Sequence, residues 1–356
     1  MQLKKSIFAL VVSLLFIQSA SFASSSEEGN PGTDLKAEIK QDIQHHLMDA
    51  HDFHLFSDKE TGAHYGFPLP VILWDNGLQV FMSSKFHHGE SVAEVNGNYY
   101  VVNHGKIYKT DESGTLEFDE SHHALNEKPF DFSITKNVFS IIVISLFIFW
   151  IFSSMAKSYK NDLAPTGAAK FLEPLVIFVR DEIARPNIGE KHYRKYMSYL
   201  LTVFFFIWIV NLFGLTPLGI NITGNIAVTF ALAILTFVIT QATAKGEYWK
   251  HIFWMPGVPV PMKFVLAPIE LLGVFIKPFA LMIRLFANIS AGHIVLMSLI
   301  GLLFVFNNWF ARGAFLGLTF FLSMIELLVA FLQAYIFTML TALYFGSAVA
   351  EHEEHH

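Results

Sequence analysis

The chain has 356 residues, of which 53% are hydrophobic and only 15% are charged, and its formal net charge is −6. Soluble domains carry about 25% charged residues, so this composition indicates an integral membrane protein with one soluble region. The sequence contains no Cys, which excludes disulfides, thiol catalysis and Cys-ligated zinc.

Residues 1–23 have the three parts of a secretory signal peptide. Lys4 and Lys5 precede an apolar run over 7–17, and small residues follow as far as Ala23. The apolar run is short for the ~20 residues that a membrane span needs. This length favours a signal peptide over the alternative, an uncleaved first transmembrane helix.

Residues 24–133 are predicted to form a small exported α+β domain on the periplasmic side. They hold 19 acidic and 7 basic residues, a net charge of −12, and 10 of the 16 His. Residues 35–56 have helical spacing. An Asp-Asn-Gly turn within 70–82 and an Asn-His-Gly turn within 98–110 predict two β-hairpins, and 110–130 is predicted to be an acidic linker.

Four His lie within the predicted N-terminal helix, at positions His45, His46, His51 and His54. Imidazole is a common metal ligand, but the spacing of these residues matches no zinc-ligand pattern. We therefore favour a solvated, acidic surface helix, and we predict no metal and no cofactor for the chain.

The membrane domain, residues 134–350, is predicted to be mainly α-helical. It contains about five membrane helices, over 138–156, 196–215, 226–244, 264–306 and 314–345. This fold class is a mainly α membrane protein with a small soluble domain at its N-terminal end.

The loops of the membrane domain predict its orientation. Residues 157–195 hold 8 Lys and Arg, and 245–263 hold three Lys, so both loops are predicted to be cytoplasmic. Residues 168–184 form an amphipathic pattern that predicts a helix along the membrane surface. The mature N-terminus is then outside, and residues 351–356 form a cytoplasmic tail.

The last two apolar stretches are too long for ordinary spans. As helices they would be about 65 Å and 48 Å long, against a bilayer core of about 30 Å. The first could be two spans, but its break at Pro278 has no polar loop beside it. We therefore predict a hairpin of two steeply tilted helices joined by a turn over 307–313.

The first helix of this hairpin carries polar residues at regular spacing. Glu270, Lys277 and Arg284 are seven residues apart, so they share one helical face, and Asn288 lies close to it. His293 is nine residues beyond Arg284 and points elsewhere on an unkinked helix.

The second helix carries a matching pair. Glu326 and Gln333 are seven residues apart and share a face. Counted from a turn centred near Trp309, His293 and Glu326 lie at one depth, nearer the outside. Arg284 and Gln333 lie at another depth, near the middle of the membrane.

An arginine at mid-membrane costs at least about 2.5–3.5 kcal/mol. It could pair internally with Gln333 or a carboxylate and lock the hairpin. His and Glu, however, suit a proton relay, whereas Arg keeps its proton and acts as a fixed positive barrier. The pattern favours two proton half-paths separated by Arg284. A carboxylate on a moving partner would release its proton there, since a nearby cation favours the charged form.

The segment "IRLFANISAGH" resembles the signature of subunit a of the F-type ATP synthase. The wider segments "PIELLGVFIKPFALMIRLFANISAGH" and "IELLVAFLQAYIFTMLTALYFG" are similar to that family's last two helices, and "NLFGLTP" matches as well. The resemblance covers about 135–350. It implies a stator subunit in the bacterial inner membrane, beside a rotating ring of c subunits. It also implies b subunits of the peripheral stalk as partners and an indirect link to the F1 sector.

The resemblance also implies roles for single residues. Arg284 matches the family's essential arginine, which attracts the ring carboxylate and blocks a proton short circuit. Asn288 and Gln333 match its polar neighbours. Glu270 matches a carboxylate of the cytoplasmic half-channel, with Lys277 in a supporting position.

The outer half-channel pair is matched by His293 and Glu326. Some family members carry these two residue types in exchanged order, which supports a shared site. The sequence departs from the family in 24–133, because many relatives have a much shorter N-terminus.

Two other classes of protein remain as alternatives. The first is a secondary ion-coupled transporter with an intramembrane Arg/His/Glu site, but no internal repeat of the kind common in that class is present. The second is a membrane enzyme, but the sequence has no HExxH or GxSxG motif. It also lacks a phosphate-binding loop, so we predict a subunit without ATP chemistry of its own and without nucleic-acid partners.

Overall fold

The computed structural model describes residues 49–58, 63–89, 91–119, 124–161, 168–216, 220–255, 257–306 and 308–350. The predicted signal peptide, most of the predicted N-terminal helix and the predicted C-terminal tail lie outside these residues. The chain divides into two compact units. The first unit comprises 1–143, 213–221 and 296–321, and the second comprises 144–212, 222–295 and 322–356.

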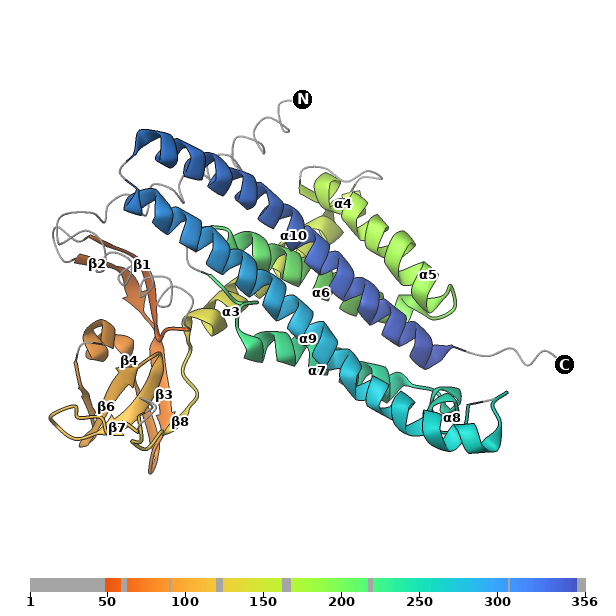
Figure 1. Ribbon diagram of the computed structural model, residues 1–356, viewed down its shortest axis with the longest axis horizontal. Helices are drawn as coiled ribbons and strands as arrows, with labels where there is room; N and C mark the ends of the chain where they lie inside the picture. The colour runs from red at the N-terminus through yellow and green to blue at the C-terminus, as the bar shows by residue number, and fades with distance from the viewer. Residues whose placement is uncertain are drawn as a thin grey trace. The chain divides into compact units, whose positions relative to one another are not determined.

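The N-terminal part of the first unit is a β-domain (Figure 1). A hairpin of β1 (Asp52–Asp58) and β2 (Ala63–Pro68) precedes two three-stranded antiparallel sheets. One sheet has the order β4-β3-β8, from β3 (Pro70–Trp74), β4 (Leu78–Met82) and β8 (Phe130–Asp131). The other has the order β5-β6-β7, from β5 (Ala93–Val95), β6 (Asn98–Asn103) and β7 (Lys106–Thr110). A short 3-10 helix, η1 (Ser83–Gly89), lies between β4 and β5.

Both predicted hairpins are confirmed. The strands β3 and β4 pair from Pro70↔Met82 to Trp74↔Leu78, and β6 pairs with β7. The turn residues Asn76 and Gly77 have positive φ angles, as do His104 and Gly105. Asn and Gly tolerate that conformation, which suits the three-residue β3–β4 loop over 75–77 and the two-residue β6–β7 loop over 104–105.

The two sheets share one apolar core. Strands β3 and β4 contribute Val71, Leu73 and Phe81, and the other sheet contributes residues such as Tyr100 and Ile107. Alternate residues of each strand point into this core, because side chains in a strand alternate between the two faces. The opposite face of each sheet therefore points away from the core.

A buried carboxylate ties the two sheets together. Asp75, in the β3–β4 turn, has an 8% exposed side chain, and its carboxylate lies 2.9 Å from Lys109 Nζ. It also accepts a hydrogen bond of 2.9 Å from the Tyr100 hydroxyl. The hydrogen bond from Lys109 lowers the pKa of Asp75 against the opposing effect of burial. Asp75 therefore stays charged at neutral pH.

Two predictions for this domain are wrong in the described residues. The predicted helix over 35–56 ends in a strand, because Asp52 begins β1, and Phe53 stacks on Phe67 of β2. His51 is buried rather than solvated, with its Nε2 2.7 Å from Asp131 Oδ2. Tertiary packing has overridden the local helical spacing.

The predicted acidic linker over 110–130 also belongs to the domain. Its backbone bonds to β7, through Lys109 N to Glu127 O at 2.9 Å, and its last residue opens β8. The side chain of Asn126 donates to Lys109 O and Thr115 O, at 3.1 and 3.3 Å. These bonds hold the segment against the sheet, although its composition is that of a linker.

The start of α3 (Lys136–Asn161) is anchored to the β-domain within the first unit. Asp49 accepts hydrogen bonds from the Asn137 backbone N–H and the Thr135 hydroxyl, each 3.0 Å long. A carboxylate at this position satisfies free N–H groups and complements the helix dipole. The ring of Phe139 packs against Phe53 and Phe67.

The remaining elements are helical. They are α4 (Ala168–Phe178), the π-helical turn η2 (Val179–Ala184), α5 (Arg185–Ile188), α6 (Tyr193–Gly214), α7 (Ile226–Thr243), α8 (Gly246–Phe253), α9 (Val260–Val305) and α10 (Trp309–Val349). Within the described ranges, five helices, α3, α6, α7, α9 and α10, are long and apolar enough to cross a membrane. The chain is a mainly helical, multi-pass membrane protein.

The last two helices are long and continuous. α9 has 46 residues and α10 has 41, and α9 contains Pro268 and Pro278 without a break. One long helix over 264–306, rather than two spans, is therefore confirmed. The predicted turn over 307–313 is wrong in its second half. Asn308 caps α10 by accepting from the Phe310 backbone N–H at 3.0 Å, so the helix begins at Trp309.

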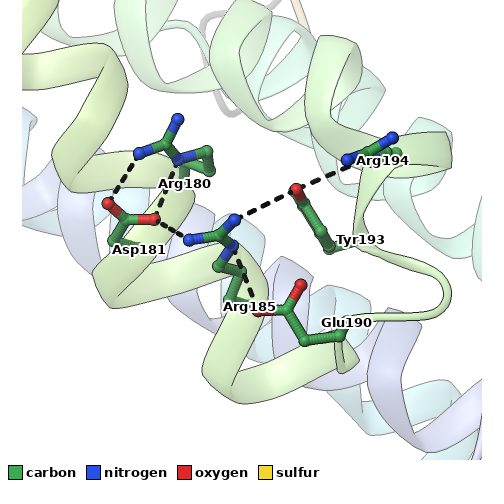
Figure 2. A network of polar contacts seen from close by, with 6 residues as sticks. All are labelled: Arg180, Asp181, Arg185, Glu190, Tyr193 and Arg194. Carbon is green, nitrogen blue, oxygen red and sulfur yellow. Dashed lines mark hydrogen bonds and ion pairs between the residues drawn. The ribbon is translucent and has the colours of Figure 1, made fainter.

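A polar network joins η2 and α5 to the start of α6 in the second unit, as Figure 2 shows. Asp181 accepts from Arg180 and from Arg185, both at 2.8 Å. Arg185 also reaches the Tyr193 hydroxyl at 3.4 Å and Glu190 at 3.2 Å. The hydrogen bond from Arg180 lowers the pKa of Asp181 against burial. The network fixes the turn over 189–192 between two helical segments.

Candidate functional site

The polar residues of interest lie on α9 and α10, which run side by side as an antiparallel pair (Figure 1). All seven predicted site residues fall in the second unit. α9 carries Glu270, Lys277, Arg284, Asn288 and His293, and α10 carries Glu326 and Gln333. Both helices are otherwise mainly apolar, although α10 also carries Arg312 and several hydroxyl-bearing residues.

His293 and Glu326 lie together. His293 Nδ1 is 3.9 Å from Glu326 Oε1, and the two side chains are 3% and 12% exposed. Gly292 leaves room for the carboxylate, because a Cβ at that position would lie 3.0 Å from Glu326 Oε1. This separation is longer than a direct hydrogen bond, so proton exchange between the buried imidazole and the carboxylate requires a closer approach or one bridging water.

Asn288 and Gln333 form a second contact between the helices. Asn288 Nδ2 donates to Gln333 Oε1 at 3.0 Å. Gln333 is 2% exposed, and its Nε2 has no hydrogen-bond partner among the described residues. The amide oxygen of Gln333 is therefore held by Asn288, and the two N–H donors of its Nε2 are left for a further group.

Arg284 lies one turn before Asn288 on α9, and its side chain is exposed. Exposed apolar residues surround it on the same helix, including Phe279 at 51% and Ile283 at 55%. Within the part of the chain that the structure describes, Arg284 makes no hydrogen bond or ion pair. The internal lock through Gln333 is not formed, because Gln333 pairs with Asn288.

Lys277 lies two turns before Arg284 and borders a small cavity that is lined by both polar and apolar side chains. Its Nζ is 5.6 Å from the centre of the Tyr344 ring, a cation–π contact between α9 and α10. The cavity is lined by residues of α7, α8, α9 and α10, among them Thr236, Thr240, Gln241, Tyr248, Lys277, Tyr344 and Ser347. Glu270 is half-buried a further two turns away on α9.

The sequence analysis missed the polar residues that α7 contributes to this cavity. A signal was present, because Thr229, Thr236 and Thr240 are seven and four residues apart and so share one face. All three are buried. Thr236 also bonds the Tyr199 hydroxyl of α6 at 2.8 Å. The spacing of hydroxyl groups along an apolar helix would have predicted a polar face.

These features define a class: multi-pass membrane proteins in which a pair of long helices carries titratable groups in register. The chain belongs to the ATP synthase subunit a family. The sequence model of the "ATP synthase A chain" family matches residues 138–346, more than half of the chain. A second model, a "Domain of unknown function (DUF8433)", matches 42–132, which includes most of the β-domain.

Individual relatives agree with the family match. "ATP synthase subunit a" of Chloroherpeton thalassium is 44% identical over 234 residues, 64% of this chain and 69% of the relative. The protein of the same name from an Anaeromyxobacter species is 42% identical over 257 residues, 70% of this chain and 60% of the relative. "ATP synthase subunit a 2" of Prosthecochloris aestuarii is 39% identical over 306 residues, 81% of this chain and 92% of the relative.

Proposed function

We propose that this chain is the proton-translocating stator subunit of the membrane sector of an F-type ATP synthase. It provides two offset half-channels that load and unload protons on carboxylates of a rotating c-subunit ring. It binds no cofactor and performs no ATP chemistry itself. Further partners are the b subunits of the peripheral stalk, and through them the F1 sector.

The outer half-channel is proposed to end at His293 and Glu326. Their 3.9 Å separation and low exposure support a shared protonatable site. A proton arriving from outside would reside on this pair before it passes to a ring carboxylate. The buried hydroxyl of Ser323, three residues before Glu326 on α10, supports a polar approach to the pair.

The inner half-channel is proposed to run through the cavity beside Lys277 and Tyr344. Its lining includes hydroxyl and amide side chains of α7 and α8, which can hold water. Glu270, on the same face of α9 as Lys277, is proposed to receive protons at the cytoplasmic end. Two turns of α9, about 10 Å, separate Lys277 from Arg284.

Arg284 is proposed to separate the two half-channels. The observation that carries this proposal is the exposed guanidinium on an apolar face, with Gln333 already held by Asn288. An Arg in this setting needs an anionic partner from another molecule, because unpaired charge in a membrane is costly. A ring carboxylate supplies that partner, and the permanent cation prevents direct proton passage between the paths.

Proton pumping in inverted membrane vesicles tests this proposal. Arg284→Ala is expected to abolish ATP-driven proton pumping while the complex still assembles. Arg312→Ala is a matched control, because Arg312 lies at the turn of the hairpin and bonds the Phe306 carbonyl at 2.9 Å. Normal pumping by Arg284→Ala would refute the proposal, and ion transport without the ATPase would indicate a transporter instead.

The shared outer site can be tested separately. Exchanging the residues, His293→Glu together with Glu326→His, is expected to retain more pumping than either single change. The pair would keep one imidazole and one carboxylate at the same place. Equal loss in all three variants would contradict a shared site.

We also propose the orientation and the boundaries of the chain. Residues 1–23 act as a signal peptide, and 24–133 lie in the periplasm. The helix over 168–184 lies along the cytoplasmic membrane surface, and 351–356 form a cytoplasmic tail in the bacterial inner membrane. Since the sequence has no Cys, single Cys residues at Glu112 and Glu190 test this arrangement. A membrane-impermeant thiol reagent added to intact cells should label only the Cys at 112.

A further inference from the structure

The outer face of the β4-β3-β8 sheet is apolar and exposed in the part of the chain that the structure describes. We call it the apolar face, and it consists of Trp74, Leu78, Val80, Met82, Phe130 and Phe132. These six side chains are between 45% and 74% exposed. The strand register makes them neighbours, since Trp74 lies opposite Leu78 on one side and Phe130 on the other. They form one continuous surface rather than scattered exposed residues.

Such a face needs an explanation in a domain of this composition. Residues 24–133 carry a net charge of −12, yet the apolar face contains no charged residue. The outer face of the β5-β6-β7 sheet is more polar. Its paired neighbours across the three strands include Glu94, Tyr99 and Thr110. Soluble monomers rarely expose continuous apolar surface of this kind, and a larger patch usually marks an interface. The domain is therefore amphipathic as a whole.

The apolar face is held close to the beginning of a membrane span. Phe132 is four residues before Lys136, where α3 begins, so at most about 15 Å of chain separates them. The Phe132 N–H bonds the Ile72 carbonyl at 2.9 Å, and the Ile134 N–H bonds the Pro70 carbonyl at 3.1 Å. The connection to α3 thus runs along β3 as an extension of the sheet.

The β-domain also contacts the first turns of α3 directly. Asp49 caps the helix, and the Lys136 N–H bonds the Ala50 carbonyl at 2.9 Å. The ring of Phe139 packs on two rings of the β-domain, those of Phe53 and Phe67. Within the first unit, the β-domain is therefore held against the first turns of α3 by hydrogen bonds and ring contacts.

We propose that the apolar face lies in the outer interface of the lipid bilayer and docks the β-domain on the membrane surface. The first turns of α3, which follow this face in the chain, also expose apolar side chains, those of Val138, Ile142 and Val143. Trp and Phe are favoured at membrane interfaces, and a partly buried apolar face binds there through the area it removes from water. Because the domain is negatively charged, anionic headgroups do not attract it. Its binding to a lipid surface therefore depends on the apolar face.

The test uses the full chain reconstituted in phosphatidylcholine vesicles. Val80→Cys and, as a second reporter, Met82→Cys are labelled with an environment-sensitive fluorophore. Glu112→Cys is the matched control, because Glu112 is exposed and lies outside the apolar face in the same domain. The expected result is a blue-shifted emission at 80 and 82, quenched by lipids with a nitroxide near the headgroup, while the label at 112 shows neither effect.

Two results in vesicles, and a third in the assembled enzyme, would overturn the proposal. Emission at 80 and 82 equal to that at 112 would show that water covers the apolar face. Blue-shifted emission that lipid nitroxides do not quench would show that protein covers it, either another part of this chain or a second copy. The same measurement on the assembled ATP synthase should again show lipid quenching, and its loss there would assign the apolar face to another subunit.

Discussion

At the residue scale, a missing side chain supports the outer proton pair. Gly292 lies on α9 next to His293, and a Cβ there would be 3.0 Å from Glu326 Oε1 and 3.4 Å from its carboxyl carbon. Contacts of that length require the carboxylate to move by a few tenths of an ångström. Gly at this position lowers the intrinsic stability of the helix by about 1 kcal/mol relative to Ala. The space that Gly292 leaves for the carboxylate of Glu326 accounts for its presence.

Gly292→Ala is expected to reduce ATP-driven proton pumping while the amount of assembled complex stays normal. The added methyl group displaces the carboxylate of Glu326 from His293, and proton transfer depends steeply on geometry. Gly273→Ala is the control, since no atom lies within 4 Å of a Cβ there and the helix is the same. Equal pumping by the two variants would show that the position of Glu326 is unimportant.

The second prediction at this scale concerns Asp75. The pKa of this carboxyl is below its ordinary value of 3.8, chiefly because Lys109 donates to it. A lowered folded-state pKa means that the ionised group stabilises the domain above pH ~4, and that this contribution is lost as the pH falls through the folded-state pKa. Asp75→Asn should lower the free energy of unfolding of the β-domain by about 1–3 kcal/mol at pH 7.

Hydrogen exchange of the β3, β6 and β7 amides in the full chain measures this effect. Comparing variant and parent at each pH removes the intrinsic pH dependence of exchange. The difference should be large at pH 7 and should shrink as the pH falls below 3.8 through the lowered pKa of Asp75 in the parent. Glu112→Gln, an exposed change in the same domain, should show no difference at either pH.

At the element scale, η2 and α5 depend on their polar network. The π-helical turn interrupts regular helix geometry, and Asp181 bridges Arg180 and Arg185 across it. Asp181→Ala should leave these two Arg without their shared acceptor and increase hydrogen exchange over 179–192. Glu182→Ala is the control at the neighbouring position, because the side chain of Glu182 makes no hydrogen bond within the described residues. High salt should weaken the difference between the variants, since the network is partly exposed.

Element prediction from the sequence succeeded where one physical effect dominates. Continuous apolar runs located all five long helices, because burial in lipid requires internally bonded backbone. The hairpin turns were predicted from residues that accept positive φ. The strand β1 was missed, since the helical spacing around His51 gives no sign of the pairing with β2 or the contact with Asp131. The start of α10 was missed because the polar residues over 307–313 suggested a turn. The cap at Asn308 instead allows the helix to begin at Trp309.

At the scale of the whole molecule, counting residues along α9 and α10 predicted which side chains lie at the same depth, although the bounds of the turn between them were predicted less well. His293 meets Glu326 although the turn ends earlier than expected. The sequence analysis placed Gln333 only at the depth of Arg284, and depth alone did not predict its contact with Asn288, one turn further along α9. The cavity beside Lys277 needs four helices together, and no single segment of the sequence indicates it.

The separation of the two half-paths leads to the last prediction. If only a moving ring carboxylate connects them, and Arg284 blocks direct passage, removing the cation should open a leak that needs no rotation. Arg284→Ala complexes stripped of F1, with the ring immobilised by cross-linking, should therefore conduct protons down an imposed gradient. The parent complex with the same cross-link should not, because its ring cannot carry protons past the cation. Proton flux measured with a pH-sensitive dye in vesicles distinguishes the two. An immobilised Arg284→Ala complex as tight as the parent would show that apolar packing, rather than the charge of Arg284, keeps the half-paths apart.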